Sequence, residues 1–333
     1  MASRRPTYGG QAVIEGVMIR GQNNISVSVR NPSGDIVTRT KPLNKIFTGP
    51  LRKTPFLRGI IALSETLYIG MDSLSYSAKI AESEEIQDDE DEKSTNKLSV
   101  AITIILSTTL AIGLFFLLPL LASTPFEYFT KSSLIANIAE GIIRLVIFIL
   151  YIYSIGLMED IKRVYMYHGA EHMTVHAQEA GKPLTVENIS KYPTAHPRCG
   201  TAFLLNVMLI SIIVFSLMPR EPISWLIISR IIFIPLIASF SYESIRISSI
   251  YDHNFFIKLL MAPSLWLQKL TTKQPDDDQI EVAIESMKAS IQYDKENMKF
   301  IYDYYILKSV PLFLFIQKRG CKNKVQMIFI KQF

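Results

Sequence analysis

The sequence predicts an α-helical polytopic membrane protein, with about four transmembrane helices and a small N-terminal α+β region in the cytosol. Hydrophobic residues make up 49% of the 333 residues, and the mean hydropathy of +0.23 favours a membrane protein. Several uncharged segments approach or exceed the roughly 20 residues that a helix needs to cross a bilayer. Short alternating segments near the N-terminus predict the sheet.

Residues 1–54 predict a β-rich cytosolic region. Residues 25–30 and 35–41 alternate between apolar and polar side chains, as half-buried strands do. The sequence NPSG between them is typical of a turn, so the two strands are expected to form a hairpin.

Residues 9–21 form a glycine-rich run, with four glycines among 13 residues, and are another feature of this region. Glycine permits tight turns and a close approach of backbones, so turns within the small sheet are the favoured interpretation. Glu15 and Arg20 give an alternative, in which they line a site. The run is not a phosphate-binding loop, because no G-K-[ST] sequence follows it.

Residues 55–80 predict an amphipathic helix. Its apolar side chains recur on one side, at Leu57, Ile60, Ile61, Leu67, Met71 and Leu74. Charged residues interrupt the same segment, so the helix is expected to lie against the membrane or the soluble region. Residues 81–97 follow as an acidic linker, for which a solvated run is the favoured interpretation.

Two predicted transmembrane hairpins, residues 98–158 and 201–240, carry the four spans. The apolar segments are residues 98–123, 134–158, 201–218 and 223–240. Glu140 and Arg144 interrupt the second segment, and Arg230 interrupts the fourth.

The distribution of basic residues predicts the orientation. Lysine and arginine concentrate before the first span, between the second and third, and after the fourth, whereas the other two connections hold only Lys131 and Arg220. Both termini and the His-rich loop of residues 159–200 are therefore expected in the cytosol. The expected partner is the lipid bilayer, and no nucleic acid is expected, because no nucleic-acid motif accompanies the basic residues.

Residues 241–293 predict an interfacial helix followed by a C-terminal helix. Residues 254–268 are apolar but too short to span, and Trp266 near their end is typical of a membrane interface. The aspartates at 276–278 can cap the next helix. Residues 294–333 form a basic tail whose structure the sequence does not assign.

The strongest functional signal is the sequence YHGAEH at residues 167–172, an H-x-x-E-H motif. On a helix, His168 and His172 lie on one face, so both imidazoles can reach one ion. Glu171 could then act on water bound to that ion. The first interpretation is therefore a catalytic divalent metal, with zinc expected and Glu171 as general base. The third ligand would be His196 or Glu243.

Two further interpretations remain open. One is a closed structural zinc site, with the ligands His168, His172, His196 and Cys199. In the other no metal binds, and histidine, glutamate and arginine side chains satisfy one another at a polar membrane interface.

Charged residues within the predicted spans form a second candidate site. Glu140 and Arg144 are four residues apart on one helix and can pair, and Arg230 could join them. Charges in lipid are costly and usually face the interior of a helical bundle. A structural ion pair is the favoured interpretation, and a polar passage or a site for a substrate headgroup is the alternative.

Several segments together resemble the YqhQ-like family of bacterial membrane proteins, a family of unknown function that is described as metal-dependent enzymes. The segments are GQAVIEGVM at 10–18, YHGAEH at 167–172, HPRCGT at 196–201, WLQ at 266–268 and PDDD at 275–278. The resemblance implies a multi-pass protein of the bacterial cytoplasmic membrane and supplies no substrate. The order H-x-x-E-H also occurs in inverzincin peptidases, but that likeness covers five residues only.

These features predict a metal-dependent hydrolase that acts on a lipid or on a peptide of a membrane protein. The competing hypothesis is a non-catalytic membrane assembly or transport-accessory protein with a structural His/Cys zinc site. Metal analysis and the Glu171→Gln variant distinguish the two hypotheses.

Overall fold

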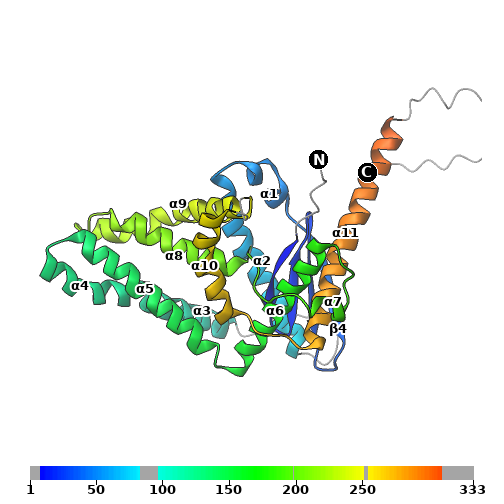
Figure 1. The fold of residues 1–333 in the computed structure, drawn as a ribbon, viewed down its shortest axis with the longest axis horizontal. Coiled ribbons are helices and arrows are strands. Elements are labelled where there is room, and N and C mark those ends of the chain that lie inside the picture. The colour runs from blue at the N-terminus through cyan, green and yellow to red at the C-terminus, as the bar shows by residue number, and fades with distance from the viewer. Residues whose placement is uncertain (1–7, 83–96, 198, 251–253, 310–333) are drawn as a thin grey trace, which may run out of the picture.

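The computed structural model describes residues 8–82, 97–197, 199–250 and 254–309. Within these ranges the chain is mostly helical, and its N-terminal part forms a small antiparallel sheet. Figure 1 shows the sheet with its covering helices at one end of the molecule, and two helical hairpins that extend away from it.

The sheet is a four-stranded meander in which neighbours in sequence are neighbours in space. Its strands are β1 (Gly9–Val13), β2 (Gly16–Arg20), β3 (Asn24–Arg30) and β4 (Ile36–Pro42). The predicted strands correspond to β3 and β4, and the glycine-rich run forms β1, β2 and the turn that joins them.

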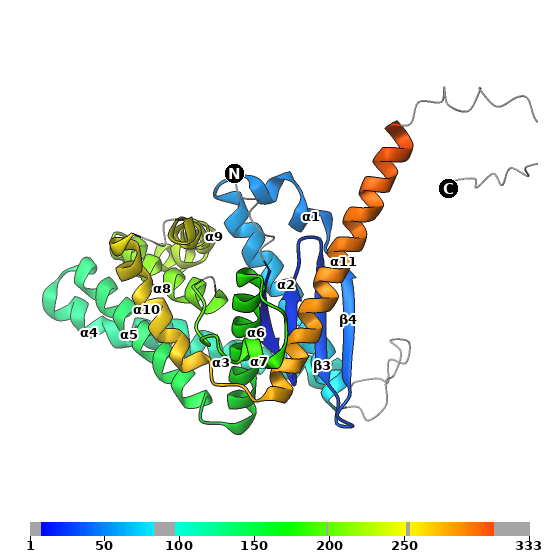
Figure 2. The same cartoon turned by 45° about the vertical axis from the view of Figure 1, so that its right-hand side comes forward.

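Helices cover both faces of the sheet, and the period of two along each strand divides the core into two layers. Val17 and Ile19 of β2 pack with side chains of α6 (Glu159–Ala180) and α11 (Asp277–Ser309). Met18 points to the other face, where α2 (Leu57–Glu82) packs. Figure 2 shows α11 lying across the sheet, with α6 beside it.

In the part of the chain that the structure describes, three helical segments are long and apolar enough to cross a membrane: Ile105–Thr130, Ser133–Ile155 and Ile223–Ser248. The helices that contain them are α3 (Lys97–Ile112) with a π-helical turn (Gly113–Leu117) and α4 (Leu118–Thr130), then α5 (Ser133–Ile155) and α9 (Ile223–Ile250). The remaining predicted span is α8 (Gly200–Ser216), an apolar helix of 17 residues. At 1.5 Å per residue it is about 26 Å long, slightly less than the hydrocarbon core of about 30 Å.

Several boundaries differ from the predicted ones. Helix α4 continues beyond residue 123, because the charge of Glu127 is paired with Arg220 at 2.9 Å. The segment predicted as a His-rich loop contains α6 and the short α7 (Val186–Ile189). In addition, α9 extends past residue 240, and α11 extends into the predicted basic tail.

The remaining helices connect these parts. Short helices α1 (Lys45–Thr48) and η1 (Pro50–Lys53) lead from the sheet to α2. Helix α10 (Phe255–Thr271) matches the predicted interfacial helix and packs on α8. Helix α2 packs on α9 as well as on the sheet, so it joins the sheet to the apolar helices.

Candidate metal centre

The YHGAEH sequence lies in the middle of α6, where the sheet meets the apolar helices. Tyr167 is buried in the core that α6 shares with β2 and α11. His168 and His172 instead approach the end of α10 and the segment before α8. Gly169 makes this arrangement possible, because a Cβ there would lie 2.1 Å from the carbonyl oxygen of Lys273.

Backbone carbonyl groups orient both imidazoles. Nδ1 of His168 lies 2.9 Å from the carbonyl oxygen of Thr271, and Nδ1 of His172 lies 2.6 Å from that of Thr194. Since a carbonyl oxygen can only accept, each Nδ1 carries the proton and each Nε2 keeps its lone pair. This is the tautomer that metal-binding histidines use when Nε2 is the ligand.

Cys199 completes a group of three potential ligands. Its Sγ lies 3.2 Å from Nε2 of His168, and the ligand atoms of His168, His172 and Cys199 all lie within 4.8 Å of one another. The buried thiol is the N-cap of α8 and accepts a hydrogen bond from the backbone N–H of Thr201 at 3.3 Å.

Glu171 is buried directly beside this group. Its Oε2 lies 3.5 Å from Nε2 of His172, and the backbone N–H of Gly10 donates to its carboxylate. Burial raises the pKa of Glu171, and the neighbouring His168 and His196 oppose that rise. A Cβ on Gly10 would lie 3.2 Å from Cγ of Glu171, so the glycine-rich strand gives the carboxylate its space.

His196 lies next to the group of three, and its backbone holds it there. Its N–H donates to Oε1 of Gln268 at 2.8 Å, and its carbonyl oxygen accepts from Nε2 of the same residue at 3.0 Å. The imidazole lies 3.5 Å from Glu179, and its centroid is 5.8 Å from that of His172. Burial lowers the pKa of His196. The ring of His176 is also near, 4.5 Å away between centroids.

Glu243, the other predicted ligand, is engaged elsewhere. Nε of Arg58 donates to its Oε1 at 2.6 Å, and the backbone N–H of Phe56 donates to the same oxygen at 3.1 Å. The carboxylate thus holds the start of α2 against α9. We therefore leave Glu243 out of the ligand set.

The charged residues of the predicted spans converge on one carboxylate. Nη2 of Arg144 lies 2.6 Å from Oε1 of Glu140, and Nη2 of Arg230 lies 3.0 Å from Oε2. Arg220 joins them at 3.1 Å from Oε2, although sequence reasoning used it only to count charge in a hairpin. The signal that could have identified Arg220 is its position in the short sequence PREP at 219–222, which joins two apolar segments.

Glu15 and Arg20, the charged residues of the glycine-rich run, both form ion pairs. Glu15 accepts from Nε of Arg163 at 2.7 Å and from the hydroxyl of Tyr167 at 3.2 Å. Nε of Arg20 lies 2.9 Å from Glu65. These contacts fasten the hairpin to α6 and to α2, which fits the favoured interpretation of the run as sheet structure.

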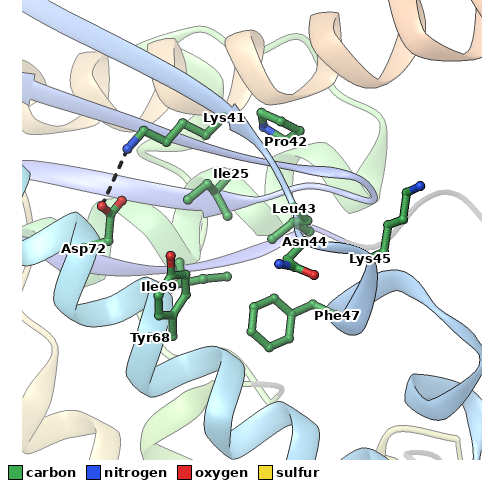
Figure 3. A pocket seen from close by; sticks show the side chains of 10 residues that line it. All are labelled: Ile25, Lys41, Pro42, Leu43, Asn44, Lys45, Phe47, Tyr68, Ile69 and Asp72. Atoms are coloured by element: carbon green, nitrogen blue, oxygen red, sulfur yellow. Dashed lines mark ion pairs between the residues drawn. The ribbon is translucent and has the colours of Figure 1, made fainter.

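A separate cavity of about 500 Å³ opens between the sheet and α2 (Figure 3). Nζ of Lys41 lies 3.6 Å from Oδ1 of Asp72 at one side of it, and Phe47 of α1 and Tyr68 of α2 line it together with residues between β4 and α1. None of the residues of the predicted sites lines this cavity.

Comparisons with known proteins found one matching family and a similar bacterial protein. Residues 54–293 match the family described as "Protein of unknown function (DUF1385)". The chain is also 36% identical to "Uncharacterized protein YqhQ" of Bacillus subtilis (strain 168), over 84% of this chain and 91% of the relative. No solved structure matches. The resemblance to YqhQ-like proteins is thereby confirmed.

Proposed function

The chain belongs to the family described as "Protein of unknown function (DUF1385)", and we propose that it is a zinc-dependent hydrolase of the bacterial cytoplasmic membrane. Its substrate class would be a lipid or a peptide of a membrane protein. The observation that carries this proposal is the convergence of His168, His172 and Cys199, whose ligand atoms lie within 4.8 Å of one another.

The donor set fits zinc. Two imidazole nitrogens and a thiolate are ligands that zinc accepts, whereas magnesium and calcium prefer oxygen. Bond lengths of about 2.1 Å to nitrogen and 2.3 Å to sulfur put neighbouring ligands of a tetrahedron about 3.6 Å apart. Nε2 of His168 and Sγ of Cys199 are 3.2 Å apart, so a small outward movement of either side chain suffices.

Glu171 is the proposed general base. Three protein ligands leave zinc a fourth position for water, and the ion makes that water easier to deprotonate near neutral pH. The carboxylate of Glu171 would lie beside an ion held by these ligands, since its Oε2 lies 3.5 Å from Nε2 of His172.

The position of the centre supports a substrate at the membrane surface. Cys199 immediately precedes α8, the predicted third span, and Thr271 is the last residue of α10. We propose four spans with both termini in the cytosol, which puts the centre at the cytosolic surface of the membrane.

A structural zinc site is the second candidate. His172 is 2% exposed and Glu171 is 3% exposed, and such burial favours a closed site in which Glu171 or His196 is the fourth ligand. In that case the protein would be a non-catalytic assembly or transport-accessory protein.

Metal analysis of the purified full-length protein tests whether the site binds zinc, which both candidate functions require. We expect about one zinc ion per chain in the wild type, and at least a tenfold loss of affinity in His168→Ala and Cys199→Ser. His176→Ala is the matched control, because it removes an imidazole from the same helix and should keep the metal. Protein purified without chelators that holds no metal would refute both zinc proposals.

The Glu171→Gln variant separates catalysis from structure. If Glu171 is the base, the variant keeps its zinc but fails to complement a strain that lacks this protein. If the variant keeps both zinc and function in cells, the catalytic proposal fails. Loss of zinc together with function would instead identify Glu171 as a ligand and favour the structural site.

A further inference from the structure

Glu140 is the centre of a buried polar cluster near the tips of the two helical hairpins, away from the candidate metal centre. Its Oε1 accepts from Nη2 of Arg144 at 2.6 Å. Its Oε2 accepts from Nη1 of Arg220 at 3.1 Å and from Nη2 of Arg230 at 3.0 Å. These four side chains are between 3% and 13% exposed, so the cluster is largely shielded even without a surrounding bilayer.

Positive charge is in excess in this cluster. The second acid is Glu127, which lies 2.9 Å from Nε of Arg220. Among the described residues, three guanidinium groups therefore face two carboxylates. A buried charge without compensation is costly, above all within a membrane. An additional negative charge would remove this cost.

Arg230 provides the hydrogen-bond donor that such an anion would need. Its Nη2 donates to Glu140 and, at 3.3 Å, to Oδ1 of Asn137, while its guanidinium lies 4.2 Å from the centroid of the Phe215 ring. Nη1 is buried and has no hydrogen-bond partner among the residues that the structure describes. Arg230 as a whole is only 8% exposed, so this N–H group needs an acceptor beyond the described residues, such as a bound ligand.

We propose that this cluster is a binding site for a phosphate group that carries one negative charge. A phosphate oxygen can accept from Nη1 of Arg230, and arginine is suited to phosphate because its planar group presents several donors. A single negative charge would balance the three arginines and two glutamates. This site is independent of the proposed zinc centre.

The depth of Arg230 makes a phospholipid headgroup one source of the phosphate. Helix α9 has 28 residues, which makes it about 42 Å long, the thickness of a bilayer with its headgroups. Arg230 lies about 10 Å from the start of that helix, close to the boundary between headgroups and hydrocarbon. The other source is a water-soluble phosphate ester that enters from the hairpin tips.

Thermal unfolding of the full-length protein in detergent tests the site. The additions are phosphatidylglycerol, diacylglycerol with the same acyl chains, and glycerophosphoglycerol, a water-soluble phosphodiester with one negative charge. We expect phosphatidylglycerol to raise the Tm by about 5 °C and diacylglycerol to leave it unchanged. Arg230→Gln should lose the increase. Lys131→Gln, which removes an exposed charge at the same end of the molecule, should keep it.

The additions also distinguish the two sources. An increase with phosphatidylglycerol alone assigns the site to lipid, and an equal increase with glycerophosphoglycerol assigns it to a soluble ester. The proposal is refuted if neither phosphate compound acts more strongly than diacylglycerol, or if Arg230→Gln responds like the wild type. A measurement that does not depend on the folding of the variant is native mass spectrometry of the wild type. One retained phosphate-bearing molecule is expected, and retention of none after exposure to both phosphate compounds contradicts the site.

Discussion

At the scale of single residues, an ion pair forms at a turn whose backbone conformation is unusual. Glu15 is the second residue of the turn between β1 and β2, and its φ of +48° is in the left-handed region that non-glycine residues seldom adopt. Its carboxylate accepts from Nε and Nη2 of Arg163, at 2.7 Å and 2.5 Å. This paired interaction holds the turn against the helix that carries His168.

The charge of Glu15 should therefore contribute to stability in a pH-dependent way. The hydrogen bond from Arg163 lowers the pKa of Glu15, so the folded state binds its proton less readily than the unfolded chain does. The contribution is complete above the ordinary value of about 4.3 and is lost as the pH falls through the lower folded value. We expect Glu15→Gln to cost about 1 kcal/mol at pH 7, since the pair is partly exposed, and almost nothing near pH 3.

Thermal unfolding of wild type and Glu15→Gln at both pH values checks this expectation. Lys162→Gln is a suitable control, because that exposed lysine lies beside Arg163 in sequence and contacts Glu159 instead. An equal loss of Tm in Glu15→Gln at pH 3 and pH 7 would show that the charge of Glu15 is not the source of its contribution.

At the scale of helices and strands, apolar periodicity predicted α2 and the strands β3 and β4, and the length of the uncharged segments predicted the long apolar helices. The end of α4 could not be predicted, because the charge of Glu127 is neutralised by a residue that lies far away in sequence, Arg220. The strands β1 and β2 carry glycines where side chains of α6 and β3 come close, so their pattern indicates turns more than strands.

The candidate metal centre could also be predicted only in part from the sequence. The spacing of His168 and His172 on α6 could be predicted from the motif, because helical geometry alone puts them on one face. The proximity of Cys199 depends on the course of the chain between α6 and α8, and the protonation of the imidazoles depends on the Thr194 and Thr271 carbonyl groups. Backbone groups leave no trace in a sequence pattern. The two orienting carbonyl groups could therefore not be predicted, whereas Cys199 was expected beside the histidines in the closed zinc site.

The pairing of α5 with its neighbours should depend on Arg144. Besides Glu140, it donates from Nε to the carbonyl oxygen of Phe115 at 2.9 Å, so it joins α5 to the π-helical turn before α4. Arg144→Ala removes both contacts, while Arg220 and Arg230 still compensate Glu140. We expect a loss of about 1–3 kcal/mol, seen as a lower Tm in detergent. An unchanged Tm would contradict a structural role of this ion pair.

At the scale of the whole molecule, the two polar sites lie at opposite ends of the apolar helices. The candidate metal centre lies beside the sheet, and the arginine cluster lies near the hairpin tips, as the arrangement of α4, α5, α8 and α9 in Figure 1 indicates. The ion pair between Glu127 and Arg220 connects the two tips, so both tips are expected on one side of the membrane.

This connection bears on α8, whose 17 residues are few for a span. If both tips lie on one side, α8 must cross despite its length. Single cysteines at exposed positions test this in intact cells, in a chain whose own Cys321 is replaced by serine. The positions are Lys131 and Glu221 at the tips and Lys182 after α6.

A membrane-impermeant thiol reagent should label cysteines at 131 and 221 directly, and a cysteine at 182 only after the cells are permeabilised. The reason is the excess of lysine and arginine near residue 182, which favours the cytosol, together with the ion pair that keeps the tips together. Labelling at 182 in intact cells would reverse the orientation and move the candidate metal centre to the outer surface. Labelling at 131 but not at 221 would mean that α8 does not cross and that the tips are on different sides. The ion pair between Glu127 and Arg220 could not then exist in the membrane.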